Sequence, residues 1–218
     1  MKVDFQVKRF KDPQAYENIY ALMRQFTLNR QADTQDELWL LEHQPVFTQG
    51  QAGKAEHLLN PGVIPVIQSD RGGQVTYHGP GQLMIYALFD LKRLQLGIKD
   101  FVQKLEQSVI TLLKSYGIEA HTQCKAPGVY VDNAKICSLG LRIRHYRAYH
   151  GMSLNVKMDL SPFSRINPCG FKQLTMTQIS EHVPDISVEK VAKDYPSILM
   201  QQFSEEVIPC LFGESHDR

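Results

Sequence analysis

The stretch from Arg71 to Gln82 constrains the fold more than any other part of the chain. It reads RGGQVTYHGPGQ and places four glycines and one proline between two apolar segments. Glycine lets the backbone approach a ligand closely and adopt conformations that other residues avoid. A plain turn would need one or two glycines and would fill its other positions with Asn, Asp or Ser. We therefore predict a loop that is held between two strands and presents a binding site.

Two common glycine-rich ligand sites do not fit this loop. The phosphate-binding loop of nucleotide-hydrolysing enzymes closes with Gly-Lys-Ser or Gly-Lys-Thr, and the dinucleotide-binding loop follows the pattern GxGxxG. Neither pattern occurs between Arg71 and Gln82. Nucleotide binding through these two devices is therefore disfavoured.

The length and charge of the chain indicate one ordinary globular unit. Its 218 residues suffice for one substantial hydrophobic core, so we expect a single domain over residues 1–218. Hydrophobic residues make up 43% of the chain and charged residues 22%, which argues against disorder. The net charge of +1 gives no general attraction to nucleic acid or to a membrane. Electrostatic recognition must therefore be local.

The sequence also bears on the cellular compartment. No apolar run approaches the roughly 18 to 20 residues of a membrane-spanning helix. The opening MKVDFQVKRF is too charged for a secretory signal, so we expect a cytoplasmic protein. The cysteines include no CxxC pair and are expected to be free thiols without a metal: Cys124, Cys137, Cys169 and Cys210.

Hydrophobic periodicity in the first half predicts strands and one helix. Residues 2–9 and 37–42 are expected to be strands, the second of them buried. Asp12 as N-cap and Pro13 at the first helical position predict a helix that runs to about Asn29. Residues 64–67 are expected to be an edge strand or the start of a strand, leading into the glycine-rich loop, and residues 83–89 a buried strand that leads away from it.

The second half predicts a helix, a run of strands and a final helix. Residues 99–115 have apolar side chains at helical spacing and are followed by Gly117, a typical helix C-cap. Residues 128–156 are expected to form strands with a turn at Asp132–Asn133. Ser187 can cap a last helix that Pro196 splits or kinks. Because helices and strands do not alternate strictly, the order predicts an α+β fold.

The glycine-rich loop resembles the signature of the lipoyl(octanoyl) transferases, and the match extends from Arg71 to Phe171 in three separated motifs. These enzymes move an octanoyl chain from acyl carrier protein onto lipoyl domains. The resemblance implies the catalytic-domain fold of biotin and lipoate protein ligases, with a mixed, largely antiparallel sheet flanked by helices. It also implies octanoyl-acyl carrier protein as donor, and as acceptors the lipoyl domains of 2-oxoacid dehydrogenases and the glycine cleavage H protein. It implies no cofactor, nucleic acid or membrane partner.

A cysteine nucleophile suits this chemistry, because it can hold the acyl group as a thioester between two attacks. The residues favour Cys169, which lies in the irregular segment RINPCGF, over Cys124, which precedes Lys125. The resemblance selects Cys169, since the nucleophile of the family lies in an N-P-x-G-like turn.

A lysine partner is expected for this thiol, because a neighbouring ammonium can lower a cysteine pKa by one or more units. By resemblance, Lys135 in DNAKICSLG is the catalytic lysine, which lowers the thiol pKa and moves the proton of the incoming amine. The alternative is an exposed lysine beside a hairpin turn. Its place at the start of an apolar strand weakens that alternative.

The resemblance also implies a substrate-binding set. Small residues in it would let an acyl chain lie close to the backbone, whose N–H groups could stabilise a tetrahedral oxyanion. His78 either acts on substrate or holds the loop by hydrogen bonds. Thr48 and Gln49 are weaker candidates for contact. The implied set is Arg71, Gly72, Gly73, Gln74, Val75, Thr76, Tyr77, His78, Ser138, Leu139, Gly140, Gly151, Met152 and Ser153.

The segment from Arg142 to His150 reads RIRHYRAYH and carries three arginines and two histidines. It is either a solvated hairpin end or a docking patch for an acidic carrier protein or lipoyl domain. An RNA-binding role has no accompanying motif.

Two other functions remain open from the sequence. An ATP-dependent lipoate protein ligase of the same fold would need an adenylate site. A non-catalytic acyl-binding module would not need both Cys169 and Lys135.

Overall fold

The computed structural model describes residues 4–124, 126–168 and 174–204. Within these residues the larger sheet has seven strands in the order β1 (Phe5–Arg9), β2 (Asp36–Leu41), β6 (Gln82–Leu88), β10 (Arg147–Asn155), β9 (Ala134–Arg144), β8 (Ala126–Val131) and β7 (His121–Gln123). The smaller sheet there has three, in the order β4 (Val66–Gln68), β3 (Val46–Gln49) and β5 (Val75–His78). The α-helices described are α1 (Tyr16–Asn29), α2 (Ile98–Ser115) and α3 (Val188–Ser204).

Strand directions confirm the mixed, largely antiparallel sheet. In the larger sheet β1 and β2 are parallel, and the other neighbouring pairs are antiparallel. In the smaller sheet β3 runs parallel to β4 and antiparallel to β5. Strands and helices are not strictly interleaved, so the α+β prediction is also confirmed.

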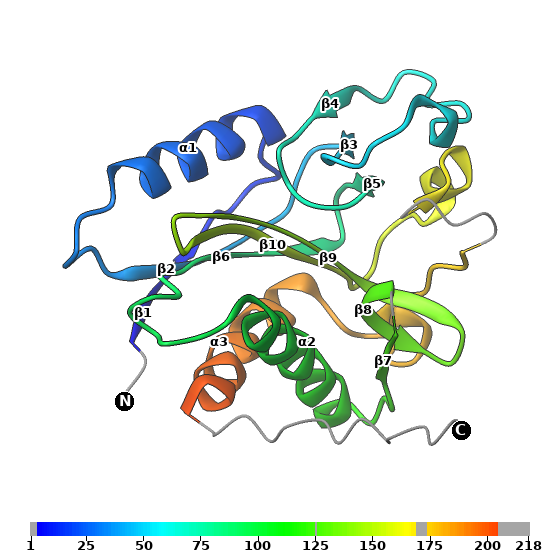
Figure 1. Ribbon diagram of the computed structural model, residues 1–218. Coiled ribbons are helices and arrows are strands. Elements are labelled where there is room, and N and C mark those ends of the chain that lie inside the picture. Colours follow the sequence, from blue (N-terminus) through cyan, green and yellow to red (C-terminus); the bar gives the residue numbers. More distant parts are fainter. Residues whose placement is uncertain (1–3, 125, 169–173, 205–218) are drawn as a thin grey trace, which may run out of the picture.

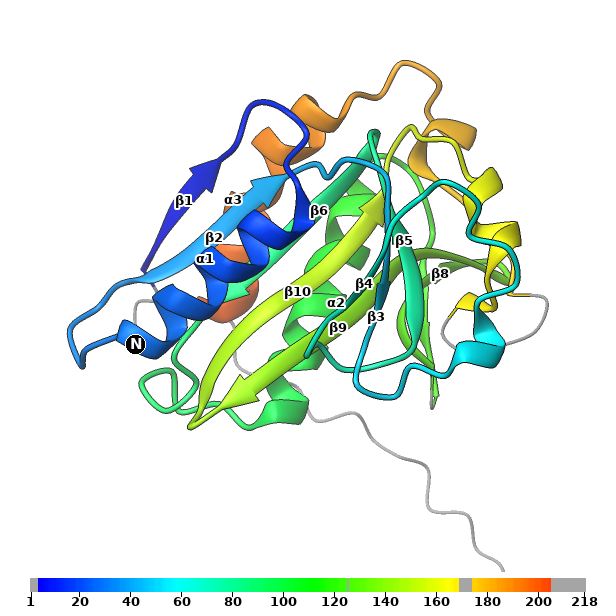
Figure 2. The ribbon, with the colours of Figure 1, turned by 90° about the horizontal axis from the view of Figure 1, so that it is seen from above.

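Helices cover both faces of the larger sheet. Figures 1 and 2 show α2 and α3 on one face, with α1 and the smaller sheet on the other. In β2, Leu38 and Leu40 pack into the cluster on the α2–α3 side, whereas Trp39 and Leu41 pack with α1. A strand that is buried on both faces is apolar without alternation. This explains the continuous apolar runs of β2 and β6.

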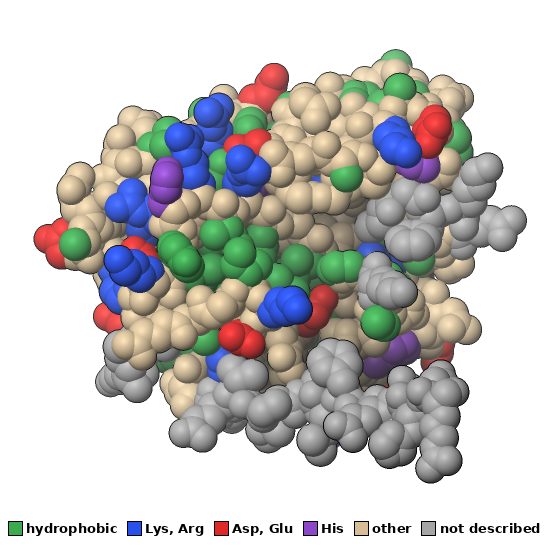
Figure 3. All heavy atoms as spheres, in the orientation of Figure 1, with side chains coloured by type: hydrophobic (Ala, Val, Ile, Leu, Met, Phe, Trp, Pro, Cys, Tyr) green, Lys and Arg blue, Asp and Glu red, His purple; other side chains and the backbone are tan. Residues whose placement is uncertain are grey.

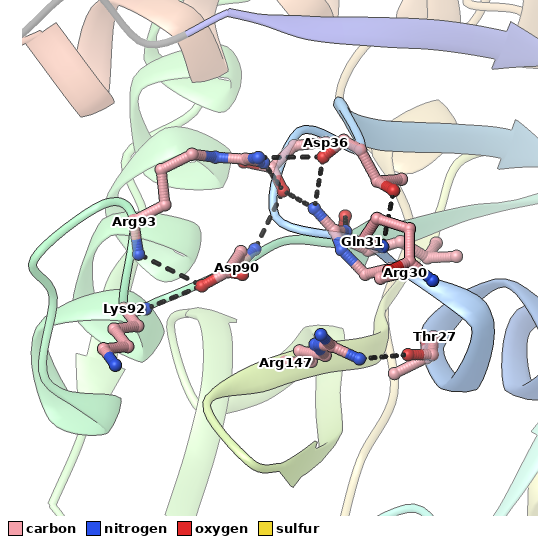
Figure 4. A network of polar contacts seen from close by, with 10 residues as sticks. Thr27, Arg30, Gln31, Asp36, Asp90, Lys92, Arg93 and Arg147 are labelled. Carbon is pink, nitrogen blue, oxygen red and sulfur yellow. Dashed lines mark hydrogen bonds and ion pairs between the residues drawn. The ribbon is translucent and has the colours of Figure 1, made fainter.

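A network of ion pairs around the buried carboxylate of Asp36 joins the end of α1, the start of β2 and the residues that follow β6 (Figure 4). The carboxylate of Asp36 lies 2.5 Å from the guanidinium of Arg30, directly after α1, and 2.6 Å from that of Arg93. It also accepts the backbone N–H of Asp90 at 2.8 Å. Arg30 donates to Leu88 O at the end of β6 as well. Removing one partner of a buried pair leaves an uncompensated charge, so the network fixes how α1, β2 and β6 meet.

The predicted start of the first helix is wrong. The helix begins at Tyr16 after Ala15, and no side chain caps it. Tertiary pairing overrides the signal at Asp12 and Pro13, because Gln14 donates its N–H to Glu42 O and accepts that of Gln44. Gln14 therefore forms an isolated parallel β-bridge with His43.

Two further predictions need correction. The stretch from Arg71 to Gln82 is not wholly a loop, since Val75–His78 form β5 and pair with β3. The last helix is not split, because α3 continues through Pro196. Its predicted cap is confirmed, since the Ser187 hydroxyl accepts the N–H of Lys190. The second helix and its glycine cap are confirmed as well, with Gly117 at φ +79°.

Among the described residues, no helix is both long enough and apolar enough to cross a membrane.

Candidate active site

A cavity of about 390 Å³ lies between the residues that follow Arg71 and the strands β6, β9 and β10. This volume falls in the range of small-molecule sites, about 300 to 1,000 Å³. The residues that line it include the apolar Val75, Met84 and Met152 and the small Ser138 and Ser153. Such a lining suits an aliphatic chain whose reacting end meets a few polar groups.

Of the predicted catalytic and substrate-binding residues that the structure describes, all but one line this cavity. Every predicted substrate-binding residue except Tyr77 lines the cavity, and so does Lys135. Tyr77 points to the other side of β5, where its ring packs against Phe47 and Phe163. Cys169 lies outside the described residues.

Hydrogen bonds fix the Arg71–Gly73 segment against two strands. Gly72 donates its N–H to Leu141 O at 2.8 Å, which places the segment on β9. The guanidinium of Arg71 donates to Thr48 Oγ1, Thr48 O and Gln74 O. Thr48, considered from sequence as a possible substrate contact, therefore holds the arginine. The buried guanidinium of Arg71 thus holds backbone oxygens of the cavity wall in place.

His78 takes part in this buried network through both ring nitrogens. Its Nδ1 lies 2.8 Å from Gln82 Oε1, and Gln82 Nε2 donates to Tyr77 O, so the amide oxygen must accept from the ring. Nε2 then accepts the hydroxyl of Thr48 at 3.2 Å. Burial holds the pKa of His78 well below its usual value. A neutral ring with both nitrogens engaged supports the loop-holding role of His78.

The same network continues to the backbone of Lys135. Gln82 Nε2 also donates to Asn155 Oδ1, and Asn155 Nδ2 donates to Thr177 O. Thr177 donates its N–H to Lys135 O, and Lys135 donates its own N–H to Thr175 O. These bonds attach the start of β9 to the segment that contains Thr175 and Thr177. Polar chains of this kind rigidify a core when every member is satisfied.

Lys135 is a buried lysine, with 1% of its surface exposed. Its Nζ donates to Pro127 O at 3.0 Å and lies 5.1 Å from the centre of the Tyr130 ring. The alternative of an exposed lysine beside a turn is wrong. A buried ammonium is costly unless it is paired and hydrogen-bonded, so this position demands compensation from its surroundings.

The described cysteines differ sharply in environment. Cys137 is fully buried in the core, and burial together with the nearby Glu106 carboxylate raises the pKa of its thiol. A thiol in that environment stays protonated and is a poor nucleophile. Cys124 is exposed and does not line the cavity.

The basic segment from Arg142 to His150 is not one solvated hairpin end. Only Arg144, His145 and Tyr146 are exposed, whereas His150 is buried and donates to Asp70 at 2.9 Å. The Tyr149 hydroxyl donates to the other oxygen of Asp70. These bonds help to lower the pKa of Asp70 to about 2, although burial opposes them.

Seven residues that line the cavity were not predicted as site residues: Tyr16, Met84, Tyr86, Ala126, Pro127, Leu141 and His150. Met84 and Tyr86 occupy alternate positions of a strand that was recognised only as buried. Period-two alternation could have found them, because one face of β6 had to meet the glycine-rich segment. Tyr16 is the first residue of α1, and its hydroxyl lies 2.7 Å from Ser69 Oγ.

Among the described residues, no group of three or more His, Cys, Asp or Glu side chains is arranged to hold a metal ion.

Comparison with known proteins agrees with this fold. Residues 15–199 match the Lipoyl protein ligase A/B catalytic domain. Lipoate-protein ligase A, in a crystal structure with ATP, superimposes with a TM-score of 0.74 at 16% identity over 92% of this chain and 84% of that one. Biotin protein ligase from Aquifex aeolicus, in complex with biotin and ATP, gives 0.56 at 12% identity over 91% and 68%. The chain belongs to the lipoyl protein ligase A/B catalytic domain family.

Sequence similarity is closer to one branch of this family. The octanoyltransferase of Hahella chejuensis is 61% identical over 178 residues, which cover 82% of this chain and 80% of the relative. Within the family the chain therefore groups with the octanoyltransferases and is an acyltransferase. The resemblance stated from the sequence is confirmed.

Proposed function

We propose that the chain takes an octanoyl group from octanoyl-acyl carrier protein onto Cys169 and passes it to a lysine of a lipoyl domain. In the first step the Cys169 thiolate attacks the donor thioester and the carrier thiol leaves. In the second step the lysine amine attacks the new thioester, and Cys169 leaves as the amide forms. No ATP is needed, because a thioester is less resonance-stabilised than an amide. A covalent intermediate divides one transfer into two easier steps.

Lys135 balances the protons of both steps in this proposal. The resting pair is a Cys169 thiolate and a Lys135 ammonium. Lys135 gives its proton to the departing carrier thiolate and becomes neutral. It then takes the proton that the attacking amine loses, which regenerates the ammonium as the Cys169 thiolate departs. A positioned group that moves protons in this way contributes typically 10² to 10⁴-fold to a rate.

The observation that carries the proposal is the buried side chain of Lys135 in the wall of an apolar cavity. Thr175, six residues after Cys169, accepts the backbone N–H of Lys135 at 2.9 Å. The chain beyond the proposed nucleophile is therefore attached to the strand of the proposed lysine. The identity of about 60% with octanoyltransferases supports the octanoyl group as cargo.

Transfer assays without ATP test the proposal. Octanoyl-acyl carrier protein, a lipoyl domain and the enzyme are mixed, and the mass of the lipoyl domain is followed. We expect one added octanoyl group with the wild-type enzyme and with Cys124→Ser, which removes an exposed cysteine outside the cavity. Cys169→Ser should lose at least 10³-fold in rate, the scale seen when a nucleophile is removed. Transfer that requires ATP and free octanoate would instead indicate a ligase.

The proposal also names the acceptors, the compartment and the extent of the catalytic domain. The acceptors are lipoyl domains of 2-oxoacid dehydrogenases and the glycine cleavage H protein, and the reaction takes place in the cytoplasm. The whole of residues 1–218 forms one catalytic domain. The exposed residues Arg144, His145 and Tyr146 remain the part of the basic segment that can meet an acidic partner.

A further inference from the structure

We propose that Glu106 is the positioning residue for Lys135 and that it acts through the peptide group between Pro127 and Gly128. This inference rests on the proposed role of Lys135 and names the group that holds it. Glu106 belongs to α2 and does not line the cavity, so it is not expected to touch substrate.

The geometry is a relay across a single peptide group. Glu106 Oε1 accepts the N–H of Gly128 at 2.7 Å. The carbonyl of the same peptide group, Pro127 O, accepts a proton of Lys135 Nζ at 3.0 Å. The carboxylate and the ammonium thus bind opposite ends of one amide dipole. Hydrogen bonds in series polarise one another, so each strengthens the other.

The carboxylate of Glu106 and the ammonium of Lys135 also stabilise each other electrostatically. Glu106 is 9% exposed and Lys135 is 1% exposed, so both groups are largely removed from water. Burial raises the pKa of Glu106, and the hydrogen bond from Gly128 and the positive charge of Lys135 oppose this rise. Attraction between two charges is mutual, so the carboxylate equally favours the ammonium form of Lys135.

The backbone at Gly128 is shaped for this contact. Its φ is +129°, in a region that L side chains rarely adopt. A Cβ atom there would lie 2.4 Å from Cys137 O and 3.2 Å from Cε of Lys135. Glycine is therefore required for the peptide group to lie between the two side chains.

Two other described groups near Lys135 differ in kind from a carboxylate. Tyr130, from β8, offers the face of its ring, and its hydroxyl donates to Ala126 O. Cys137, from β9, has a thiol whose pKa is raised by burial. Glu106 is a carboxylate that interacts electrostatically with Lys135.

The test is a direct titration of Lys135 in the full-length chain. Lysine labelled with ¹³C at Cε reports the protonation of each side chain by NMR, and Lys135→Met assigns the signal. All proteins carry Cys169→Ser, so that a thiolate does not contribute. Glu106→Gln keeps an oxygen that can accept from Gly128 but removes the charge. Glu119→Gln makes the same change at an exposed position and serves as the matched control.

We expect Glu106→Gln to move the Lys135 titration midpoint to lower pH by roughly one unit, the lower end of the effect of an opposite charge nearby. Glu119→Gln should leave it unchanged. Glu106→Asp, which keeps the charge on a shorter side chain, should shift it less than Gln. An unchanged midpoint in Glu106→Gln, or an equal shift in Asp and Gln, overturns the proposal.

The titration separates this inference from the proposed function. It measures Lys135 in a protein without the Cys169 thiol, so its outcome does not depend on acyl transfer. If the wild-type enzyme transfers no octanoyl group but Glu106→Gln still shifts Lys135, the proposed function fails and the positioning role stands. If transfer requires Cys169 but the midpoint does not move, the reverse holds.

Discussion

Lys135 is the residue on which the proposed chemistry depends, and hydrogen bonds hold it in its buried position. Its backbone N–H and C=O are both bound by the segment at Thr175 to Thr177, and its Nζ is bound to Pro127 O. Rotamer freedom of a long side chain is costly to remove. In the proposed mechanism this fixed cation favours ionisation of the Cys169 thiol.

Replacing Lys135 should change the ionisation of Cys169. In a chain with Cys124→Ser and Cys210→Ser, alkylation of Cys169 by iodoacetamide is followed against pH by peptide mass. Lys135→Met, which removes the charge and keeps similar volume, should move the midpoint up by about one unit or more, because the thiolate loses its neighbouring ammonium.

Lys114→Met serves as the control for that experiment, since Lys114 lies exposed at the end of α2. Coincident alkylation profiles for Lys135→Met and wild type would remove Lys135 from the proposed pair. Buried Cys137 should stay unmodified in every variant, because its thiol is inaccessible and its pKa is raised by burial.

At the scale of elements, His43 connects the residues just before α1 to β6 of the larger sheet. Its Nδ1 donates to Gln14 O at 2.9 Å, and Nε2 accepts the Tyr86 hydroxyl at 2.6 Å. Burial lowers the pKa of His43 to about 4. The folded chain therefore keeps this ring neutral at a pH where the unfolded chain has already protonated it.

This difference predicts how stability depends on pH. Between pH 6.5 and about 4 the unfolded state binds a proton that the folded state does not, so stability is complete above pH 6.5 and falls as the pH falls. Each such group contributes about 1.4 kcal/mol per pH unit in that window. His43→Gln should reduce the pH slope of the free energy of unfolding, measured with urea from pH 7 to 5, by about that amount.

The matched control is His182→Gln, because His182 is exposed. It should leave the slope as in the wild type. A slope for His43→Gln that equals the wild-type slope would show that His43 takes up its proton equally in both states.

Elements with strong hydrophobic periodicity were predictable from the sequence, but the residues at which they begin and end were less so. The apolar spacing of residues 99–115 sufficed for α2, and turn residues at Asp132–Asn133 sufficed for the β8–β9 hairpin. The start of α1 was not predictable, because the pairing of Gln14 with residues near His43 overrides a good local cap signal. Local signals report propensity, whereas ends are decided by contacts between distant segments.

At the scale of the whole molecule, the cavity is built from segments far apart in the sequence. Residues of the Arg71–Gln82 stretch, the start of β9 and the middle of β10 meet there, as the resemblance implied. The contributions of Tyr16 and His150 were not predictable, because they depend on how α1 and Asp70 pack on the sheet. Glu106 carries no motif, and its proposed role follows only from the peptide group that both it and Lys135 contact.

One face of the outer surface is mixed in character. Figure 3 shows hydrophobic side chains gathered across the middle of one face, over the β9–β10 hairpin of Figure 1, with Lys and Arg side chains nearby. Leu141 and Ile143 of β9 are half-buried, and Tyr146 at the hairpin turn is 62% exposed. Apolar surface beside positive charge suits a visiting acidic protein domain.

The mass of the enzyme after exposure to donor alone tests the central claim most directly. We predict that octanoyl-acyl carrier protein, without acceptor, adds one octanoyl group to the peptide that contains Cys169. Neutral hydroxylamine should release this group, and a lipoyl domain added later should receive it. Transfer to the lipoyl domain by Cys169→Ser at the wild-type rate, with no adduct on either enzyme, would contradict the account.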